Sequence, residues 1–206
     1  SHDLGARPHW LAASTHPGDE AAAVPAHGAL AGNIPGLLTL IAPRHPERTA
    51  EIADMLRTRG ITPAIRSQGD HIAADTEIYI ADTLGEMGLL YRTVETVFVA
   101  GSLADHGGHN PVEPALLENA LLAGPDMRNF DDACAALEGA GALTRIAGAD
   151  ALAAALRPLL NNPELRQQQA AAALASARLL GGASDRALAE ILRLLGPAEK
   201  PAHAHT

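Results

Sequence analysis

The segment TVFVAGSLADHGGHNPVEP, residues 96–114, decides the fold of this 206-residue chain. Its apolar start, residues 96–99, predicts a buried strand. A glycine-rich turn follows, and Asn110, Pro111 and Glu113 then have the spacing of an N-cap, a first helical residue and a third helical residue. A strand, a glycine turn and a helix start direct free backbone N–H groups toward an anion. The amide and carboxylate of the same segment predict that the ligand also carries hydroxyl groups.

The same alternation of apolar runs and helical patterns extends along the chain. Strands are predicted over residues 9–14, 37–42, 64–66, 77–81, 96–100, 120–123 and 142–146. Helices are predicted between them, over residues 17–30, 46–59, 86–91, 111–118 and 130–139. This order favours βαβ units and a Rossmann-like three-layer α/β/α fold with a mainly parallel sheet.

The C-terminal part of the chain is Ala-rich and predicts helices over residues 151–160, 163–180 and 184–195, with a turn at Gly181 and Gly182. We expect one domain over residues 1–196 and a disordered tail over residues 197–206.

Composition excludes several classes of protein. The formal charge of −9 argues against non-specific binding of nucleic acid and gives no attraction to anionic lipid. The single cysteine, Cys134, excludes a disulfide framework, suits a cytoplasmic setting and is expected to be a small buried residue. No stretch approaches the roughly 20 apolar residues of a membrane span, and no signal peptide is expected. This chain is therefore expected to be soluble by itself.

Polar loops follow four of the predicted strands, and each precedes a helix, at residues 14–20, 43–48, 82–87 and 101–110. In a parallel sheet such loops meet at the carboxyl edge, where ligands bind. Taken together, the four loops predict a pocket for a polar ligand linked to a nucleotide.

Each loop alone also has a simpler interpretation. Thr83 with Glu86 has the spacing of a capping box, as does Asn110 with Glu113. Arg44 is different, because a cation is disfavoured at a helix N-terminus. We expect its guanidinium to bind a phosphate, a carboxylate or a base edge. An ion pair of Arg44 with Glu47 or Asp82 is the alternative.

These loops, in this order, resemble the C-terminal half of the Kdo transferases, which attach 3-deoxy-D-manno-octulosonic acid (Kdo) to the lipid A precursor. The matching strings are WLAASTH at 10–16, PRHPER at 43–48, DTLGEMGLLY at 82–91 and GSL through GGHNPVEP at 101–114. Leu84 and Met87 exchange the usual Met and Leu of the family, and Ala100 stands where Gly is common. Asp126-Met127-Arg128 replaces a more usual His-Thr-Phe.

The resemblance implies the C-terminal half of a two-domain GT-B glycosyltransferase. In that family this half holds the donor CMP-Kdo, whereas the N-terminal half binds the lipid A precursor and supplies the catalytic carboxylate. This chain alone is therefore expected to bind CMP-Kdo or CMP without catalysing transfer, and to need no cofactor or metal. The full-length protein is expected at the cytoplasmic face of the bacterial inner membrane, with membrane association only through the missing half.

The resemblance also implies which residues bind the donor, and none of them is catalytic. Those near the phosphate, the sugar acid, the cytosine and the ribose are Ser14, Thr15, His16, Pro43 and Arg44. Those that line the nucleotide or bind hydroxyl groups are Leu84, Gly85, Glu86, Gly108, Asn110 and Glu113.

Three alternatives stay open at this stage. The first is another GT-B enzyme, such as a nucleotide-sugar epimerase or a different glycosyltransferase, because glycine loops and helix-start carboxylates are shared across that architecture. The second is a zinc hydrolase that uses Asp105, His106 and His109, although these histidines flank glycines in a loop and lack a preset ligand geometry. The third is a scaffold without catalytic function.

Overall fold

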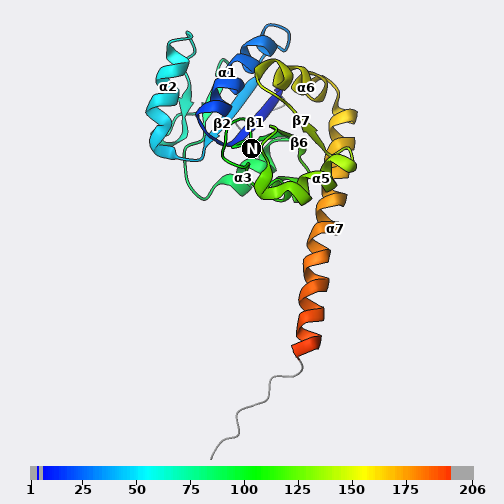
Figure 1. Ribbon diagram of the computed structural model, residues 1–206. Coiled ribbons are helices and arrows are strands. Elements are labelled where there is room, and N and C mark those ends of the chain that lie inside the picture. The colour runs from blue at the N-terminus through cyan, green and yellow to red at the C-terminus, as the bar shows by residue number, and fades with distance from the viewer. Residues whose placement is uncertain (1–3, 5–6, 196–206) are drawn as a thin grey trace, which may run out of the picture.

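The seven strands form one parallel sheet inside a three-layer α/β/α domain (Figure 1). The computed structural model describes Leu4 and residues 7–195, with residues 182–195 described as backbone only. The strand order is β3-β4-β2-β1-β5-β6-β7, and every neighbouring pair is parallel. The strands are β1 His9–Thr15, β2 Leu38–Pro43, β3 Ala64–Ile65, β4 Ile78–Ile80, β5 Thr96–Val99, β6 Ala120–Ala123 and β7 Leu143–Arg145. The order reverses between β1 and β5, which is the switch point where open α/β sheets bind ligands.

Helices cover both faces of this sheet. They are α1 Pro17–Ala31, α2 Thr49–Arg57, α3 Met87–Thr93, α4 Val112–Leu116, α5 Asp131–Gly139, α6 Ala149–Asn161 and α7 Pro163–Leu195. Short 3-10 turns are η1 Pro46–Arg48, η2 Arg66–Gln68 and η3 Arg128–Phe130. Side chains from α1, α2 and α6 pack on one face, and those from α3, α4, α5 and the first part of α7 pack on the other.

The strands are apolar without a break because both faces of the sheet are covered. In β1, Trp10 and Ala12 pack with Phe98 under α1 and α6, whereas Leu11 and Ala13 pack toward the opposite layer. Trp10 and Phe98 are among the largest fully buried side chains, and Ala, Leu, Ile and Val fill the remaining core. The strands predicted from the sequence are all present.

Two helix predictions were wrong in detail. The helix predicted over residues 46–59 is divided into η1 and α2. The turn predicted at Gly181 and Gly182 is absent, because α7 continues unbroken from Pro163 to Leu195. Each helical Gly costs only about 1 kcal/mol relative to Ala, which the Ala, Leu and Arg residues around the pair offset. The predicted tail over 197–206 lies outside the described residues.

Cys134 is buried in α5, and its burial raises the pKa of the thiol. In the part of the chain that the structure describes, no helix is both long enough and apolar enough to cross a bilayer.

Candidate functional site at the carboxyl edge

The loops after β1, β2 and β4 line a cavity of about 190 Å³ at the carboxyl edge of the sheet. Its lining includes Ser14, Pro43, Arg44, Thr83, Leu84, Gly85 and Met87. The loop after β5 adjoins the turn after β1, because Nε2 of His109 lies 3.1 Å from Nε2 of His16. The structure thus brings together four loops that are far apart in the sequence, as predicted.

Ser14 enters this cavity through an irregularity at the end of β1. The pairing register with β2 shifts between Ala13 and Thr15, and Ser14 has a φ of 59°. A residue other than Gly in this left-handed region costs of order 1 kcal/mol, and such strain is concentrated at binding sites. The shift directs Ser14 out of the strand alternation and into the cavity lining.

Arg44 is exposed at the rim of the cavity, and its backbone N–H donates to the Thr15 carbonyl over 3.0 Å. Among the described residues, its guanidinium forms no ion pair, so the alternative pairing with Glu47 or Asp82 is not present. Glu47 lies 3.5 Å from Nδ1 of His45 instead, and Asp82 accepts hydrogen bonds from hydroxyl groups. The charge of Arg44 is therefore available to an anionic ligand.

Glu86 is held by Arg66, and the alternative interpretation of Thr83 and Glu86 as a capping box is wrong, because α3 has no side-chain cap. Nη2 of Arg66 donates to Oε1 of Glu86 over 2.6 Å, and Nε of Arg66 donates to Oε2. The Thr83 hydroxyl donates to the same carboxylate. These contacts, Arg66 first and Thr83 second, lower the pKa of Glu86 to about 2. Next to Arg66, Ser67 donates its N–H and its hydroxyl to Asp82 over 2.9 Å and 2.6 Å. The segment after β3 thereby fixes both acids of the loop after β4.

Asp19 joins the loops on the two sides of the switch point, and the sequence analysis did not single it out. This fully buried carboxylate accepts the backbone N–H groups of His16, Gly101 and Leu103 over 3.0, 2.8 and 3.2 Å. In the sequence, an acid in the first turn of a helix has the appearance of an ordinary cap, so the long-range contact gave no signal.

Thr15, predicted to lie near the phosphate or carboxylate of the donor, is fully buried and is not part of the cavity lining. Its hydroxyl donates to Oε1 of Glu20 over 2.7 Å, and Glu20 also receives two hydrogen bonds from Arg48 at 2.8 and 2.7 Å. Thr15 therefore holds the turn after β1 in place.

The glycine-rich loop after β5 is shaped by residues with positive φ. Gly107 and Gly108 have φ values of 79° and 74°, and a Cβ on Gly108 would come within 2.2 Å of Met127 Sδ. Oδ2 of Asp126 accepts the Gly107 N–H over 2.8 Å. Gly108 is buried, so its side of the loop packs on the Asp126-Met127-Arg128 segment that departs from the family pattern.

The helix after Asn110 begins one residue later than predicted, so Asn110 precedes the N-cap instead of occupying it. Its Oδ1 accepts the Val112 N–H over 2.9 Å, and α4 begins at Val112 with Pro111 as N-cap. Asn110 and Glu113 are exposed, so their remaining polar atoms face solvent at this edge.

Four histidines, here called the histidine cluster, lie together at the switch point: His16, His45, His106 and His109. The His16 ring stacks on His106 and His109 with centroids 4.0 and 5.3 Å apart, and the centroid of His45 lies 5.7 Å away. Nε2 of His16 and Nε2 of His109 are hydrogen bonded at 3.1 Å. From the sequence, only His16 was predicted to contact the donor, and His106 and His109 were candidates only for the zinc alternative.

The zinc alternative finds no support in this geometry. Asp105 forms an ion pair with Arg128 and is 87% exposed. In the described part of the chain, no group of three or more His, Cys, Asp or Glu residues has an arrangement that could hold a metal ion.

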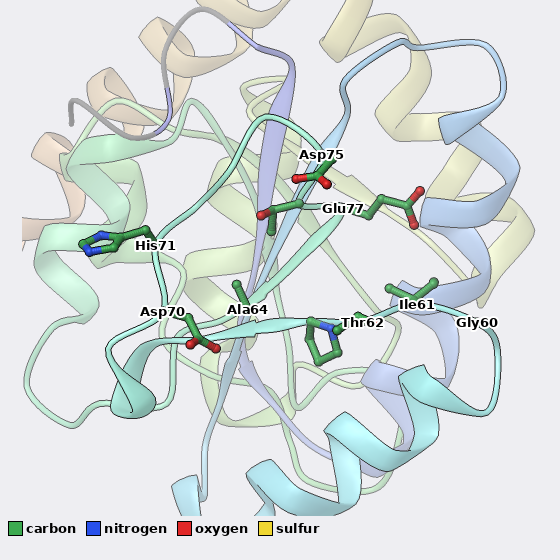
Figure 2. Close-up of a pocket in the computed structure, with 10 residues that line it drawn as sticks. Gly60, Ile61, Thr62, Ala64, Asp70, His71, Asp75 and Glu77 are labelled. Carbon is green, nitrogen blue, oxygen red and sulfur yellow. The ribbon is translucent and has the colours of Figure 1, made fainter.

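A larger cavity, of about 510 Å³, lies between the segments that lead into β3 and β4 (Figure 2). Its lining carries Asp70, Asp75 and Glu77, with His71 beside them. These carboxylates repel an anionic nucleotide, so the smaller cavity beside Arg44 is the candidate site.

Comparison with known proteins places the chain among transferases. No family model matches it. The 3-deoxy-D-manno-octulosonic acid transferase of Haemophilus influenzae is 39% identical over 163 residues, which cover 79% of this chain and 38% of that protein. The enzyme of the same name from Bordetella pertussis is 36% identical over 195 residues, 92% of this chain and 45% of that protein. The chain thus spans less than half the length of these curated relatives.

Solved structures agree with this result. The C-terminal CMP-Kdo binding domain of WaaA from Acinetobacter baumannii aligns with a TM-score of 0.79 and 30% identity, over 84% of this chain and 90% of that domain. The glycosyltransferase WaaG aligns with a TM-score of 0.54 over 86% of this chain and 44% of its own, and at 14% identity this likeness concerns the fold alone. The fold is that of the C-terminal half of a GT-B glycosyltransferase, as predicted. The chain therefore belongs to the 3-deoxy-D-manno-octulosonic acid transferase family, in which it corresponds to the C-terminal domain.

Proposed function

We propose that this chain is the donor-binding domain of a Kdo transferase and that it binds CMP-Kdo at the carboxyl edge of its sheet. The full-length protein then adds Kdo to the lipid A precursor during lipopolysaccharide biosynthesis, at the cytoplasmic face of the bacterial inner membrane. Its N-terminal half binds the lipid acceptor, makes the membrane association and supplies the general base.

The observation that carries this proposal is the Arg44 guanidinium, which has no ion-pair partner among the described residues and lies beside a cavity lined by three loops. Arginine binds phosphate and carboxylate through two parallel hydrogen bonds, and it stays charged at every physiological pH. The relatives of the chain support cytidine as the nucleotide, because the solved domain from Acinetobacter baumannii is described as binding CMP-Kdo.

In the reaction, a hydroxyl group of the acceptor attacks the anomeric carbon of Kdo, and cytidine monophosphate leaves. Negative charge accumulates on the leaving phosphate, so positive charge fixed nearby stabilises the transition state more than the ground state. We assign this role to Arg44, with the N-terminus of α1 behind Ser14. Pro43, Leu84 and Gly85 line the nucleotide, and Glu86, Asn110 and Glu113 accept hydroxyl groups of the ribose or the sugar.

Titration calorimetry with cytidine monophosphate tests the assignment. We expect weak binding by the wild-type chain, and about tenfold or greater weakening by Arg44→Ala, because a hydrogen bond to a charged group contributes about 1.5–3 kcal/mol. Arg59→Ala is the matched control, since Arg59 is an exposed arginine just after α2 whose one side-chain hydrogen bond within the described part of the chain is to the Met55 carbonyl. Equal affinities for these two variants would contradict the role of Arg44.

Two further outcomes separate this proposal from its alternatives. Preference for uridine monophosphate over cytidine monophosphate would favour a nucleotide-sugar epimerase or another glycosyltransferase. Turnover of CMP-Kdo by the isolated chain would contradict the assignment of the general base to the N-terminal half.

A further inference from the structure

The histidine cluster lies at the carboxyl edge beside Arg44, outside the lining of the 190 Å³ cavity. Its members come from three loops of the carboxyl edge, after β1, β2 and β5. Arg44, which lines the cavity, is close enough to affect the charge of His109. Among the described residues, the one side-chain hydrogen bond of the His16 and His109 rings is the 3.1 Å contact that they share, and the His16 side chain also meets the backbone of the first turn of α1.

The charges around the cluster disfavour its protonation while the site holds no anion. The pKa of His16 is lowered to about 4, first by burial and then by His106 and His109. The pKa of His109 is also lowered, first by burial and then by Arg44. His45 lowers both pKa values, and Asp19 is the acid that opposes these shifts.

Asp19 does not outweigh these effects, because the pKa of both rings stays below its ordinary value. The 3.1 Å contact between the two Nε2 atoms is then a hydrogen bond in which one neutral ring donates and the other accepts. An anion that enters beside these rings reverses the balance, because a negative charge within about 4–6 Å favours the protonated form.

We propose that the histidine cluster and Arg44 form the subsite for the anionic group of the ligand, a phosphate or a carboxylate, and that this subsite takes up a proton from solvent when the anion binds. The proton is added to a ring nitrogen of His16 or His109 and gives one imidazolium ion. The inference rests on the proposed function, because both place the donor at this edge of the sheet.

Calorimetry in phosphate-free buffers of different ionisation enthalpy measures the proton directly. For the wild-type chain at neutral pH, we expect cytidine monophosphate to bind with uptake of up to about one proton, and cytidine with none. The affinity for cytidine monophosphate should consequently fall with rising pH, by at most about tenfold per pH unit for one proton.

A second titration, with free Kdo added to the chain saturated with cytidine monophosphate, shows whether the anion that causes proton uptake is the phosphate or the carboxylate. Uptake in the first step supports the phosphate, and uptake only in the second step supports the carboxylate.

Variants distinguish proton uptake by the histidine cluster from protonation of the nucleotide's own phosphate. In a His16→Gln/His109→Gln double variant the proton uptake should be lost, apart from the small contribution of the nucleotide itself. His71→Gln is the matched control, since His71 lies in the separate cavity shown in Figure 2 and should leave the uptake unchanged. Nuclear magnetic resonance of the wild-type chain is the second measurement, and here the pKa of His16 or His109 should rise on binding.

Absence of proton uptake in both calorimetric steps, with unshifted imidazole signals, would overturn the inference. If cytidine monophosphate binds but neither step takes up a proton, the proposed function stands and only the subsite fails. If cytidine monophosphate does not bind at all, both fail.

Discussion

Replacement of Asp19 tests whether one buried carboxylate holds the two sides of the ligand site together. Asp19→Ala leaves the N–H groups of His16, Gly101 and Leu103 without their acceptor. A hydrogen bond to a charged group contributes about 1.5–3 kcal/mol, and the three contributions are not additive because one carboxylate makes them all. We therefore expect the free energy of unfolding to fall by about 3–5 kcal/mol.

Asp19→Asn should cost less, about 1–3 kcal/mol. The amide oxygen can replace Oδ2 and keep the bonds to His16 and Gly101, whereas the amide nitrogen then faces the Leu103 N–H. Urea unfolding followed by circular dichroism measures both variants. The control is Asp132→Ala, an exposed acid in the first turn of α5, for which we expect a loss below about 1 kcal/mol. A loss for Asp19→Ala no larger than that of the control would refute the reasoning.

Three further predictions concern the loops of the same edge. Because Arg66 lowers the pKa of Glu86 to about 2, their pair stabilises the fold above the carboxyl's ordinary pKa, and this contribution is lost as the pH falls from about 4.5 to 2. Arg66→Ala should therefore flatten the decline of the thermal midpoint over that range, and an unchanged decline would count against the pair. Gly108→Ala should lower the free energy of unfolding by about 1–3 kcal/mol through its φ and its contact with Met127, and by more than Gly36→Ala, where φ is 72° and the space is open. Ser14→Gly should keep or raise the free energy of unfolding, because Gly adopts a φ of 59° without strain. Ser14→Val should lower it by about 1–2 kcal/mol, and urea unfolding measures both.

The sequence predicts the strands of this fold well because each is an apolar run between turn residues. The strands predicted over residues 96–100 and 120–123 agree within one residue with β5 and β6. The helix boundaries were less certain, because caps and packing determine them together. Gly181 and Gly182 show the limit, since a glycine pair favours a turn but does not force one when the flanking residues favour a helix.

The candidate site was predictable only in its outline. Arg44 could be found because a cation at a helix start has no local role. The contacts of Asp19 and the pairing of His16 with His109 could not be found, since the histidines are 93 residues apart and the strand order that joins them is not written in any local pattern. For Glu86 the local pattern was misleading. Its spacing from Thr83 is that of a capping box, whereas its ion-pair partner, Arg66, lies in the segment after β3.

The outermost strands of the sheet are very short, with two residues in β3 and three in β7. An unpaired strand edge is a template for other chains, and the danger grows with the number of free N–H and C=O groups that it presents in a row. Here each edge offers fewer than the typical five or six residues of a strand. The side chain of Arg145 on β7 is also held by Glu138 and the Gly124 carbonyl, which places charge along that border. The domain is thereby protected against edge-to-edge aggregation, and concentrated samples of it should resist growth into extended intermolecular sheets.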